Sequence, residues 1–449
     1  MLFLSLLILQ PRFRGVCLNI RRLYSGALGF RKELDSLLRW NAREDPHVAN
    51  LAQEIIDQVR KEGDSSVLNL CRKYDKVYSE TVLDLAIDQS ELRSAFEEIP
   101  EKDSDALVQA ANRIEKYHRA QKQGDFQITD DSGNNIGQIV TALDRVGVYV
   151  PGGQAAYPSS VLMTVIPATV AGVSEIAVAV PTPQGQRNSH VLAALHITGV
   201  REVYSIGGAQ AVAAMAYGTE TIRKVDKIVG PGGAIVAAAK RLVYGPVGID
   251  MIAGPSEVLI IADPTANPDW VALDLFSQAE HGENSQSILL CPDENFLRLV
   301  EESMERHINS LSRKNIIVKS LETRGAFVLT KDLEEAVAIS NIIAPEHLQL
   351  AVAKPRKLMQ QVRHAGAIFL GVKTPEVLGD YTAGPSHVLP TFGTARYSSP
   401  LGVYDFQKRS SVIECVPEGL NDVASIAAVI ADMEGLTAHA SAARARIRD

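Results

Sequence analysis

Apolar residues recur at intervals of three and four along the chain from Asn50 to Gln121, as at Leu51, Ile55 and Val59. This spacing places apolar side chains on one face of a helix. We therefore predict a mainly helical region before residue 149.

From Val146 onward, short β-branched runs alternate with helical patterns, and the strands end at Gly or Pro. In a first block we predict strands over 146–150, 176–180, 202–206 and 227–229, with helices over 160–171, 190–198, 210–217 and 235–242. In a second block we predict strands over 258–262, 287–291, 327–329, 348–352 and 367–370, with helices over 269–280 and 296–312. Strand–helix alternation of this length is typical of parallel sheets covered on both faces. The expected fold class is α/β, with two doubly wound, incomplete Rossmann-like lobes.

The chain has 449 residues, which is more than one ordinary core accommodates. We divide it into an extension (1–18), a helical region packing on the second lobe (19–149), a first lobe (150–255), a second lobe (256–399) and a small C-terminal tail domain (400–449). A helix is expected from Asp422 onward.

Composition narrows the class of protein. Hydrophobic residues make up 46% and charged residues 22%, as in a soluble globular protein. The net charge of −8 argues against a nucleic-acid partner, whose binding surface is normally basic. The four scattered cysteines form no CxxC pair, so we expect neither a disulfide framework nor a thiolate metal site. This cysteine usage also leads us to expect a cytoplasmic location.

The first residues are unusual. The apolar run 2–9 is too short to span a bilayer, so no membrane partner is expected. No acidic residue precedes Glu33, which suits an organelle transit peptide. The simpler explanation is that these residues lie upstream of the true start and that the protein begins near Asn19.

Three predicted strand ends carry glycines, at Pro151–Gly153, Gly207–Gly208 and Gly230–Gly233. In doubly wound folds, ligands bind at the carboxyl ends of strands, and the last of these loops opens a helix whose N–H groups suit a phosphate. It departs from a dinucleotide fingerprint because Ile235 stands where the third glycine belongs. Phosphate binding and a simple tight turn both remain open.

The run Ala344–Leu348 contains the most specific chemistry. Pro345 forces an extended turn before a strand, so Glu346 and His347 sit side by side on a rigid segment. Two adjacent titratable groups suit stepwise acid–base catalysis. A surface ion pair is the competing interpretation.

Three further segments carry possible ligands. Gln278 and His281 are three apart on one helix face near its C-terminus, where a lone histidine is more often an exposed cap. Asp380 lies in a loop rich in glycine and proline, and the tail holds His439. Zinc accepts imidazole and carboxylate readily, but amide oxygen is an uncommon ligand. The sequence alone does not show that these segments meet.

Seven motifs, in the same order, resemble histidinol dehydrogenases from about Asn19 to the C-terminus. They are Val146–Gly153, Gly207–Ala211, Ala253–Glu257, Ser277–His281, Ala344–His347, Gly379–Pro390 and Glu434–His439. The resemblance implies oxidation of L-histidinol to L-histidine through L-histidinal, with two NAD+ consumed and one Zn2+ per subunit.

The resemblance also implies roles for individual residues. Glu346 and His347 are the implied acid–base pair. The implied zinc ligands, which also contact substrate, are Gln278, His281, Asp380 and His439. Ser256, His347 and Glu434 are implied to bind substrate, and Tyr149, Gln210 and the position of Gly233 to bind NAD. Gly233 departs from the family, which has Asn there, so we expect NAD affinity to be several-fold weaker.

The family also forms homodimers, which implies that Glu434 and His439 of the tail act in the partner's site. Two rival interpretations remain open. One is a related enzyme that oxidises another small alcohol. The other is a non-catalytic NAD-binding or scaffold protein, although no residue of the expected chemistry is missing.

Overall fold

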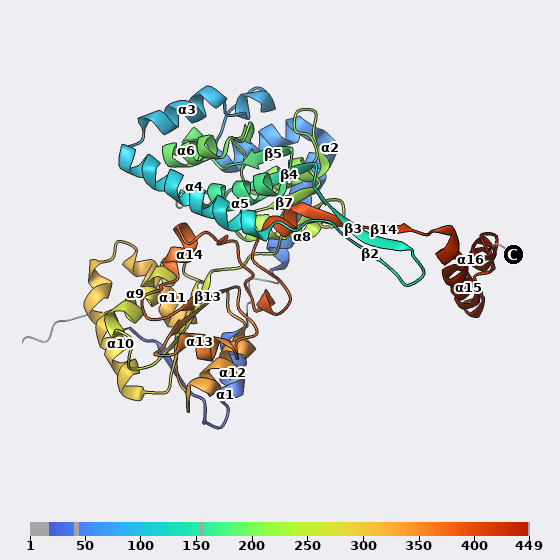
Figure 1. Cartoon of the computed structure of the whole chain (residues 1–449). Helices are drawn as coiled ribbons and strands as arrows, with labels where there is room; N and C mark the ends of the chain where they lie inside the picture. The colour runs from blue at the N-terminus through green and yellow to red at the C-terminus, as the bar shows by residue number, and fades with distance from the viewer. Residues whose placement is uncertain (1–17, 40–44, 153–155, 448–449) are drawn as a thin grey trace, which may run out of the picture.

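The computed structural model describes residues 18–39, 45–152 and 156–447. Two α/β lobes lie against each other, and a β-arm carries the last two helices away from both (Figure 1). The α/β class with parallel sheets is confirmed.

The first lobe contains a five-stranded parallel sheet in the order β6-β5-β4-β7-β8. Its strands are β4 (Arg145–Tyr149), β5 (Glu175–Ala179), β6 (Glu202–Tyr204), β7 (Lys227–Val229) and β8 (Gly248–Ile249), and its helices are α5 (Pro158–Ala171), α6 (Ser189–Thr198), α7 (Gly208–Tyr217) and α8 (Ala234–Val243). The sheet thus begins at β4, five residues before the expected lobe boundary. Strand order reverses between β4 and β7, which makes this the switch point of a doubly wound sheet.

The N-terminal helices complete the first lobe. They are α2 (Pro46–Leu70), α3 (Gln89–Glu98) and α4 (Glu101–Gln121). Helix α2 packs on α7 and α8, and α3 and α4 pack on α5 and α6. The prediction that this region packs on the second lobe is wrong for these three helices, because their apolar faces pack against the helices that cover the two faces of the first sheet.

The second lobe repeats the same strand order with one strand added at the edge, β1-β11-β10-β9-β12-β13, all parallel. Its strands are β1 (Arg21–Tyr24), β9 (Glu257–Ala262), β10 (Gln286–Cys291), β11 (Ala326–Leu329), β12 (His347–Ala351) and β13 (Ala367–Leu370). Helices α9 (Pro268–Ala279), α10 (Glu294–His307) and α11 (Lys314–Arg324) cover one face, and α1 (Phe30–Leu37), α12 (Leu333–Ile343) and α13 (Pro355–Met359) the other. The predicted helix 296–312 ends earlier, in a 3₁₀ turn at Ile308–Ser310.

The tail belongs to a separate antiparallel sheet in the order β14-β3-β2, which joins β2 (Phe126–Thr129), β3 (Asn135–Ala142) and β14 (Gln407–Glu414). It leads to α15 (Pro417–Met433) and α16 (Thr437–Arg444), which stand clear of the lobes in Figure 1. Helix α15 begins before the predicted Asp422, and Gly435, at φ 72°, separates the two helices.

Within the described ranges, no helix combines the length and the apolar character needed to cross a bilayer. The predicted transit or extension segment lies, apart from Leu18, outside the described residues. Leu18 itself is buried in the core of the second lobe, so that core begins one residue earlier than we expected.

Candidate active site

A cavity of about 620 Å³ lies between the two lobes. The first lobe lines it with the carboxyl ends of its strands, through Gly152 after β4 and Gly233 after β7. The second lobe contributes the amino ends of β9 and β12, where Ser256 and His347 lie. The rule that ligands bind at carboxyl ends therefore holds for the first lobe alone.

Glu346 and His347 are held at the entry to β12 by an unusual turn. Ala344 ends α12 in the left-handed region, at φ 53°, and Pro345 then directs the chain into the strand. Glu346 and His347 are only 6% and 3% exposed. The interpretation as a surface ion pair is therefore wrong.

The main chain of Glu257 fixes both side chains. Its N–H donates to Oε2 of Glu346 at 2.7 Å, and its carbonyl oxygen lies 3.0 Å from Nδ1 of His347. The carbonyl can only accept, so Nδ1 of His347 carries the proton in this contact. Nε2 is left to face the cavity, 3.5 Å from Oδ1 of Asp380. A neutral His347 in this tautomer presents its basic nitrogen to the cavity.

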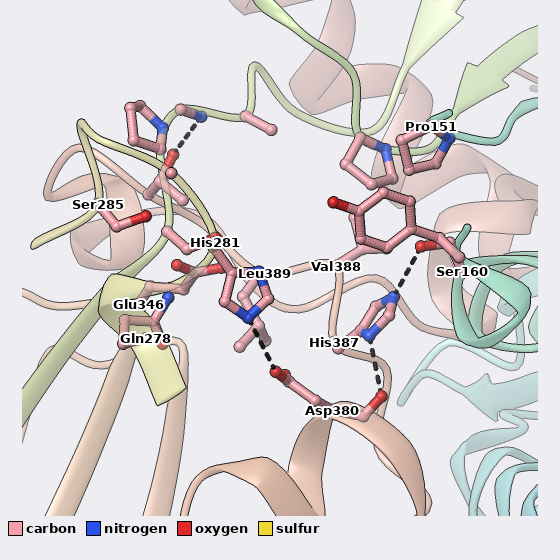
Figure 2. Close-up of a pocket in the computed structure, with 18 of the residues that line it drawn as sticks. Pro151, Ser160, Gln278, His281, Ser285, Glu346, Asp380, His387, Val388 and Leu389 are labelled. Atoms are coloured by element: carbon pink, nitrogen blue, oxygen red, sulfur yellow. Dashed lines mark hydrogen bonds and ion pairs between the residues drawn. The ribbon is translucent and has the colours of Figure 1, made fainter. Parts of the chain in front are cut away.

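Gln278, His281 and Asp380 surround the same region of the cavity (Figure 2). Helix α9 ends at this edge, which brings Gln278 and His281 to the site, and Asp380 comes from the short helix α14 (Val377–Tyr381). Nε2 of His281 lies 3.8 Å from Oδ2 of Asp380. Gln278 is 1% exposed, and both of its amide atoms are buried without a hydrogen-bond partner. A buried amide in that state is costly and points to a missing ligand.

Carboxylates outnumber cations around His347. Burial raises the pKa of Glu346 to about 8 and that of Glu376 to about 7. Burial alone would lower the pKa of His347, but Glu346 and Asp380 raise it to about 10. At these values Glu346 and His347 both hold protons near neutral pH. A bound cation would compensate the carboxylates, lower both pKa values and so allow Glu346 and His347 to accept protons.

The sequence-predicted metal set is brought together only in part. Gln278, His281 and Asp380 meet, whereas His439 is exposed on α16 and does not line the cavity. Among the described residues, no three His, Cys, Asp or Glu side chains converge as a metal site. The three residues that do meet fit zinc in ligand type, with a fourth ligand still required.

His387 links the two lobes and was not among the predicted site residues. Its Nδ1 lies 3.0 Å from the carbonyl oxygen of Asp380, and its Nε2 lies 3.2 Å from Oγ of Ser160 on α5 (Figure 2). The sequence signal was its place in the glycine- and proline-rich loop. Glu257 and Glu376 were also missed, and Glu376 has no local motif that would have identified it.

The predicted cofactor residues fall into two groups. Gly233 lines the cavity, at the N-terminus of α8. Tyr149 and Gln210 are buried beside it in the first lobe, where the Tyr149 hydroxyl accepts from the N–H of Gly208 at 3.1 Å. Neither of the two lines the cavity.

A buried ion pair supports the loop that contains Gly233. Lys240 and Asp250 form an ion pair, and both bind the main chain of Gly230. Nζ of Lys240 donates to the carbonyl oxygen of Gly230 at 2.8 Å, and the N–H of Gly230 donates to Asp250 at 2.7 Å. Gly230 has φ 109°, and a Cβ there would lie 2.1 Å from the carbonyl oxygen of Tyr149. The start of the loop is therefore fixed.

Comparison with known proteins identifies the family of this chain. The family model for histidinol dehydrogenase matches residues 38–447. Histidinol dehydrogenase of Hydrogenovibrio crunogenus is 52% identical over 96% of this chain and 100% of its own length. That of Pseudomonas aeruginosa is 53% identical, over 96% and 98%. The crystal structure of histidinol dehydrogenase from Elizabethkingia anophelis superposes with a TM-score of 0.90 at 35% identity, covering 95% of this chain and 98% of that one. The chain therefore belongs to the histidinol dehydrogenase family of oxidoreductases.

Proposed function

We propose that this chain oxidises L-histidinol to L-histidine through L-histidinal, with two NAD+ consumed in succession. The observation that carries the proposal is the buried pair of Glu346 and His347, which faces Gln278, His281 and Asp380 across one cavity. That arrangement combines an acid–base pair with a set of candidate metal ligands.

Zinc is the proposed metal. Gln278, His281 and Asp380 would hold it, and the unpartnered amide of Gln278 supports that role. When bound, the metal would orient the substrate through its imidazole and amine, which is a template role. His439 of a second copy is the proposed fourth ligand.

His347 serves as the base in the first oxidation. Its Nε2 takes the hydroxyl proton of the alcohol as the carbon loses a hydride, and the contact of Nδ1 with Glu257 holds the ring in place. NAD+ supplies the hydride acceptor in both steps.

Glu346 serves in the second oxidation. It removes a proton from water as the oxygen of that water bonds to the aldehyde carbon, while His347 returns the proton from the first step to the aldehyde oxygen, which gives the hydrate. The hydrate then loses a hydride from carbon to the second NAD+ and a hydroxyl proton to His347, which gives the carboxylic acid, and the acid releases its remaining proton to solvent as the carboxylate. One water is consumed and two hydrides leave, so the bound aldehyde never needs to enter solvent.

The tail is proposed to act in the partner's site of a homodimer. Glu434 and His439 are exposed in their own chain. Apolar side chains of the same segment are also exposed, namely Val423, Ile426, Val429, Ile430, Met433 and Leu436. A continuous apolar helix face of this kind suits burial against a second copy.

The test is a substrate panel with purified, zinc-loaded protein and NAD+, followed by NADH absorbance. L-Histidinol should be oxidised with the highest kcat/KM among small amino alcohols. A clearly better alcohol in the panel would favour a relative with altered substrate preference. No NADH from any alcohol would favour a non-catalytic protein.

A further inference from the structure

Asp75 lies at the end of a turn that no motif identified. A π-helical turn, Cys71–Asp75, extends α2, and Lys76 follows in the left-handed region at φ 57°. Nε2 of Gln210 donates to Oδ2 of Asp75 at 3.1 Å, and the N–H of Gly207 also donates to this carboxylate. Two directed donors hold the carboxylate at one place, and the side chain remains partly exposed.

The carboxylate lies at the carboxyl edge of the first sheet, near the side of the cavity that Gly152 lines. A Cβ built on Gly207, which follows β6, would lie 3.1 Å from Oδ1 of Asp75 and 3.0 Å from Cβ of Pro181. A Cβ built on Gly152, which lines the cavity, would lie 3.2 Å from the carbonyl oxygen of Pro181. Gly152, Pro181 and Gly207 therefore lie close together between the cavity and Asp75.

The strand order explains why an acidic group at this place matters. In doubly wound sheets the pyrophosphate sits beside the first strand, which is β4 here. The ribose of the adenosine half lies toward the end of the second strand, where an acidic side chain takes its 2′-hydroxyl. The second strand is β5, and the residues after it, Val180–Gln186, contain no acid. Asp75, supplied by the N-terminal helices, stands beside that position.

We propose that Asp75 selects NAD+ over NADP+ by accepting the ribose 2′-hydroxyl and repelling a 2′-phosphate. The proposal rests on the proposed use of a nicotinamide dinucleotide.

Three cations neighbour Asp75 in the sequence, but each has a local partner. Arg72 lies over the ring of Tyr78, Lys73 over that of Tyr74, and Nζ of Lys76 donates to the carbonyl oxygen of Lys73.

The experiment compares kcat/KM for NAD+ and NADP+ at saturating L-histidinol in the wild type, Asp75→Asn and Asp75→Ser. The wild type should prefer NAD+, and both variants should lower the NAD+/NADP+ ratio by about tenfold or more, because a charge repulsion is removed. Glu62→Gln is the matched control, since it removes one exposed negative charge from α2. The KM for L-histidinol should stay constant in all variants.

Three results would overturn the role of Asp75: a wild type that uses both cofactors equally, an unchanged ratio in the variants, or the same change in Glu62→Gln. Asp75→Asn keeps the size of the side chain and therefore remains the test if Asp75→Ser folds poorly. Equilibrium titration with NAD+ and NADP+ without substrate separates the two proposals. Selective NAD+ binding without histidinol oxidation would reject the proposed reaction and retain the role of Asp75.

Discussion

The main-chain N–H of Glu257 donates a hydrogen bond of 2.7 Å to Oε2 of Glu346. The carbonyl oxygen of the same residue lies 3.0 Å from Nδ1 of His347. One residue of β9 therefore orients both members of the acid–base pair on β12, and β9 and β12 are adjacent in the sheet. Orientation by main-chain groups does not depend on a side chain and leaves little freedom to either partner.

His347→Asn should lower kcat by about 10²- to 10⁴-fold, because the base of the first oxidation is lost. Glu346→Gln should slow the oxidation of L-histidinal by a similar factor and that of L-histidinol less. Steady-state kinetics with each substrate measure both effects. His307→Asn, on α10 and outside the cavity, is the control. Equal losses on both substrates in Glu346→Gln would reject its assignment to the second step.

Removal of zinc should abolish activity, and stoichiometric zinc should restore it. Without the metal that Gln278, His281 and Asp380 would hold, nothing would orient the imidazole and amine of the substrate in the cavity. Elemental analysis should find about one zinc per chain, and His281→Ala should lower that value. Full activity in protein verified to be metal-free would contradict the template role.

Mixed dimers test whether the tail acts in trans. His439→Ala and Glu346→Ala should each be inactive alone. After subunit exchange, one site of each mixed dimer would combine an intact Glu346 with an intact His439 from the other chain, so part of the activity should return. Dimers are purified with two different tags before assay. No recovery in these verified mixed dimers would show that the tail serves its own chain.

Gly233→Asn should lower the KM for NAD+ several-fold, since one net hydrogen bond contributes about 1 kcal/mol. The position accepts the change without strain: φ is −63°, and a Cβ added there would meet no other atom within 4 Å. Asn would also cap α8, which now has no side-chain cap. Gly233→Ser is the control, because it caps the helix with a shorter side chain. A KM for NAD+ that does not change in Gly233→Asn would reject the predicted cofactor contact.

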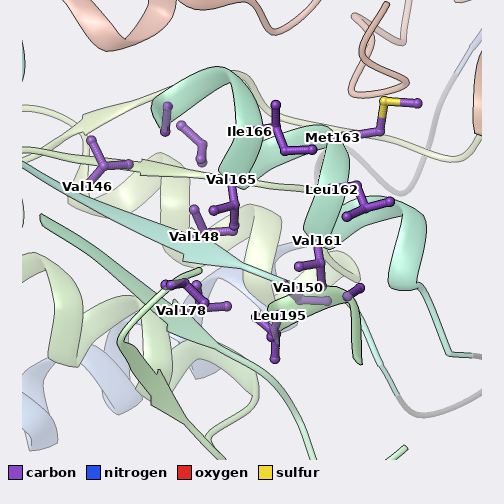
Figure 3. Packing of buried hydrophobic residues seen from close by; sticks show 14 of the residues in the cluster. Val146, Val148, Val150, Val161, Leu162, Met163, Val165, Ile166, Val178 and Leu195 are labelled. Atoms are coloured by element: carbon purple, nitrogen blue, oxygen red, sulfur yellow. The ribbon is translucent and has the colours of Figure 1, made fainter. Parts of the chain in front are cut away.

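Periodicity predicted the doubly wound lobes because their strands are buried on both faces. Val146 and Val148 of β4, and Val150 directly after it, point toward α5, where they meet Val161 and Val165 in the core (Figure 3). Between them, Tyr149 points to the opposite face, against α2 and α7. A buried run of this kind is a strong local signal.

The elements that periodicity missed depend on distant partners. Strand β1 is a four-residue edge strand whose register comes from β11, about three hundred residues later. Strands β2 and β3 are largely exposed, and β3 pairs with β14 from the far end of the chain. Neither strand has a face of buried apolar residues, so no periodic pattern marks it in the sequence, and pairing with distant strands decides its structure.

The candidate site was predictable where a motif carries the chemistry. Glu346, His347, Gln278, His281 and Asp380 all line one cavity, which the family resemblance implied but the residues alone did not show. Glu376 could not be predicted, because its closeness to the site follows from the placement of α14 on the second lobe. Nor could the sequence show that the first lobe lines the cavity with the carboxyl ends of its strands and the second lobe with the amino ends of its strands.

The most direct test of the proposed reaction counts NADH against histidine. Zinc-loaded protein is incubated with a limiting amount of L-histidinol and excess NAD+, and both products are quantified at completion. The proposed reaction predicts two NADH for each L-histidine, with no free L-histidinal. One NADH per substrate with release of the aldehyde, or no L-histidine at all, would contradict it.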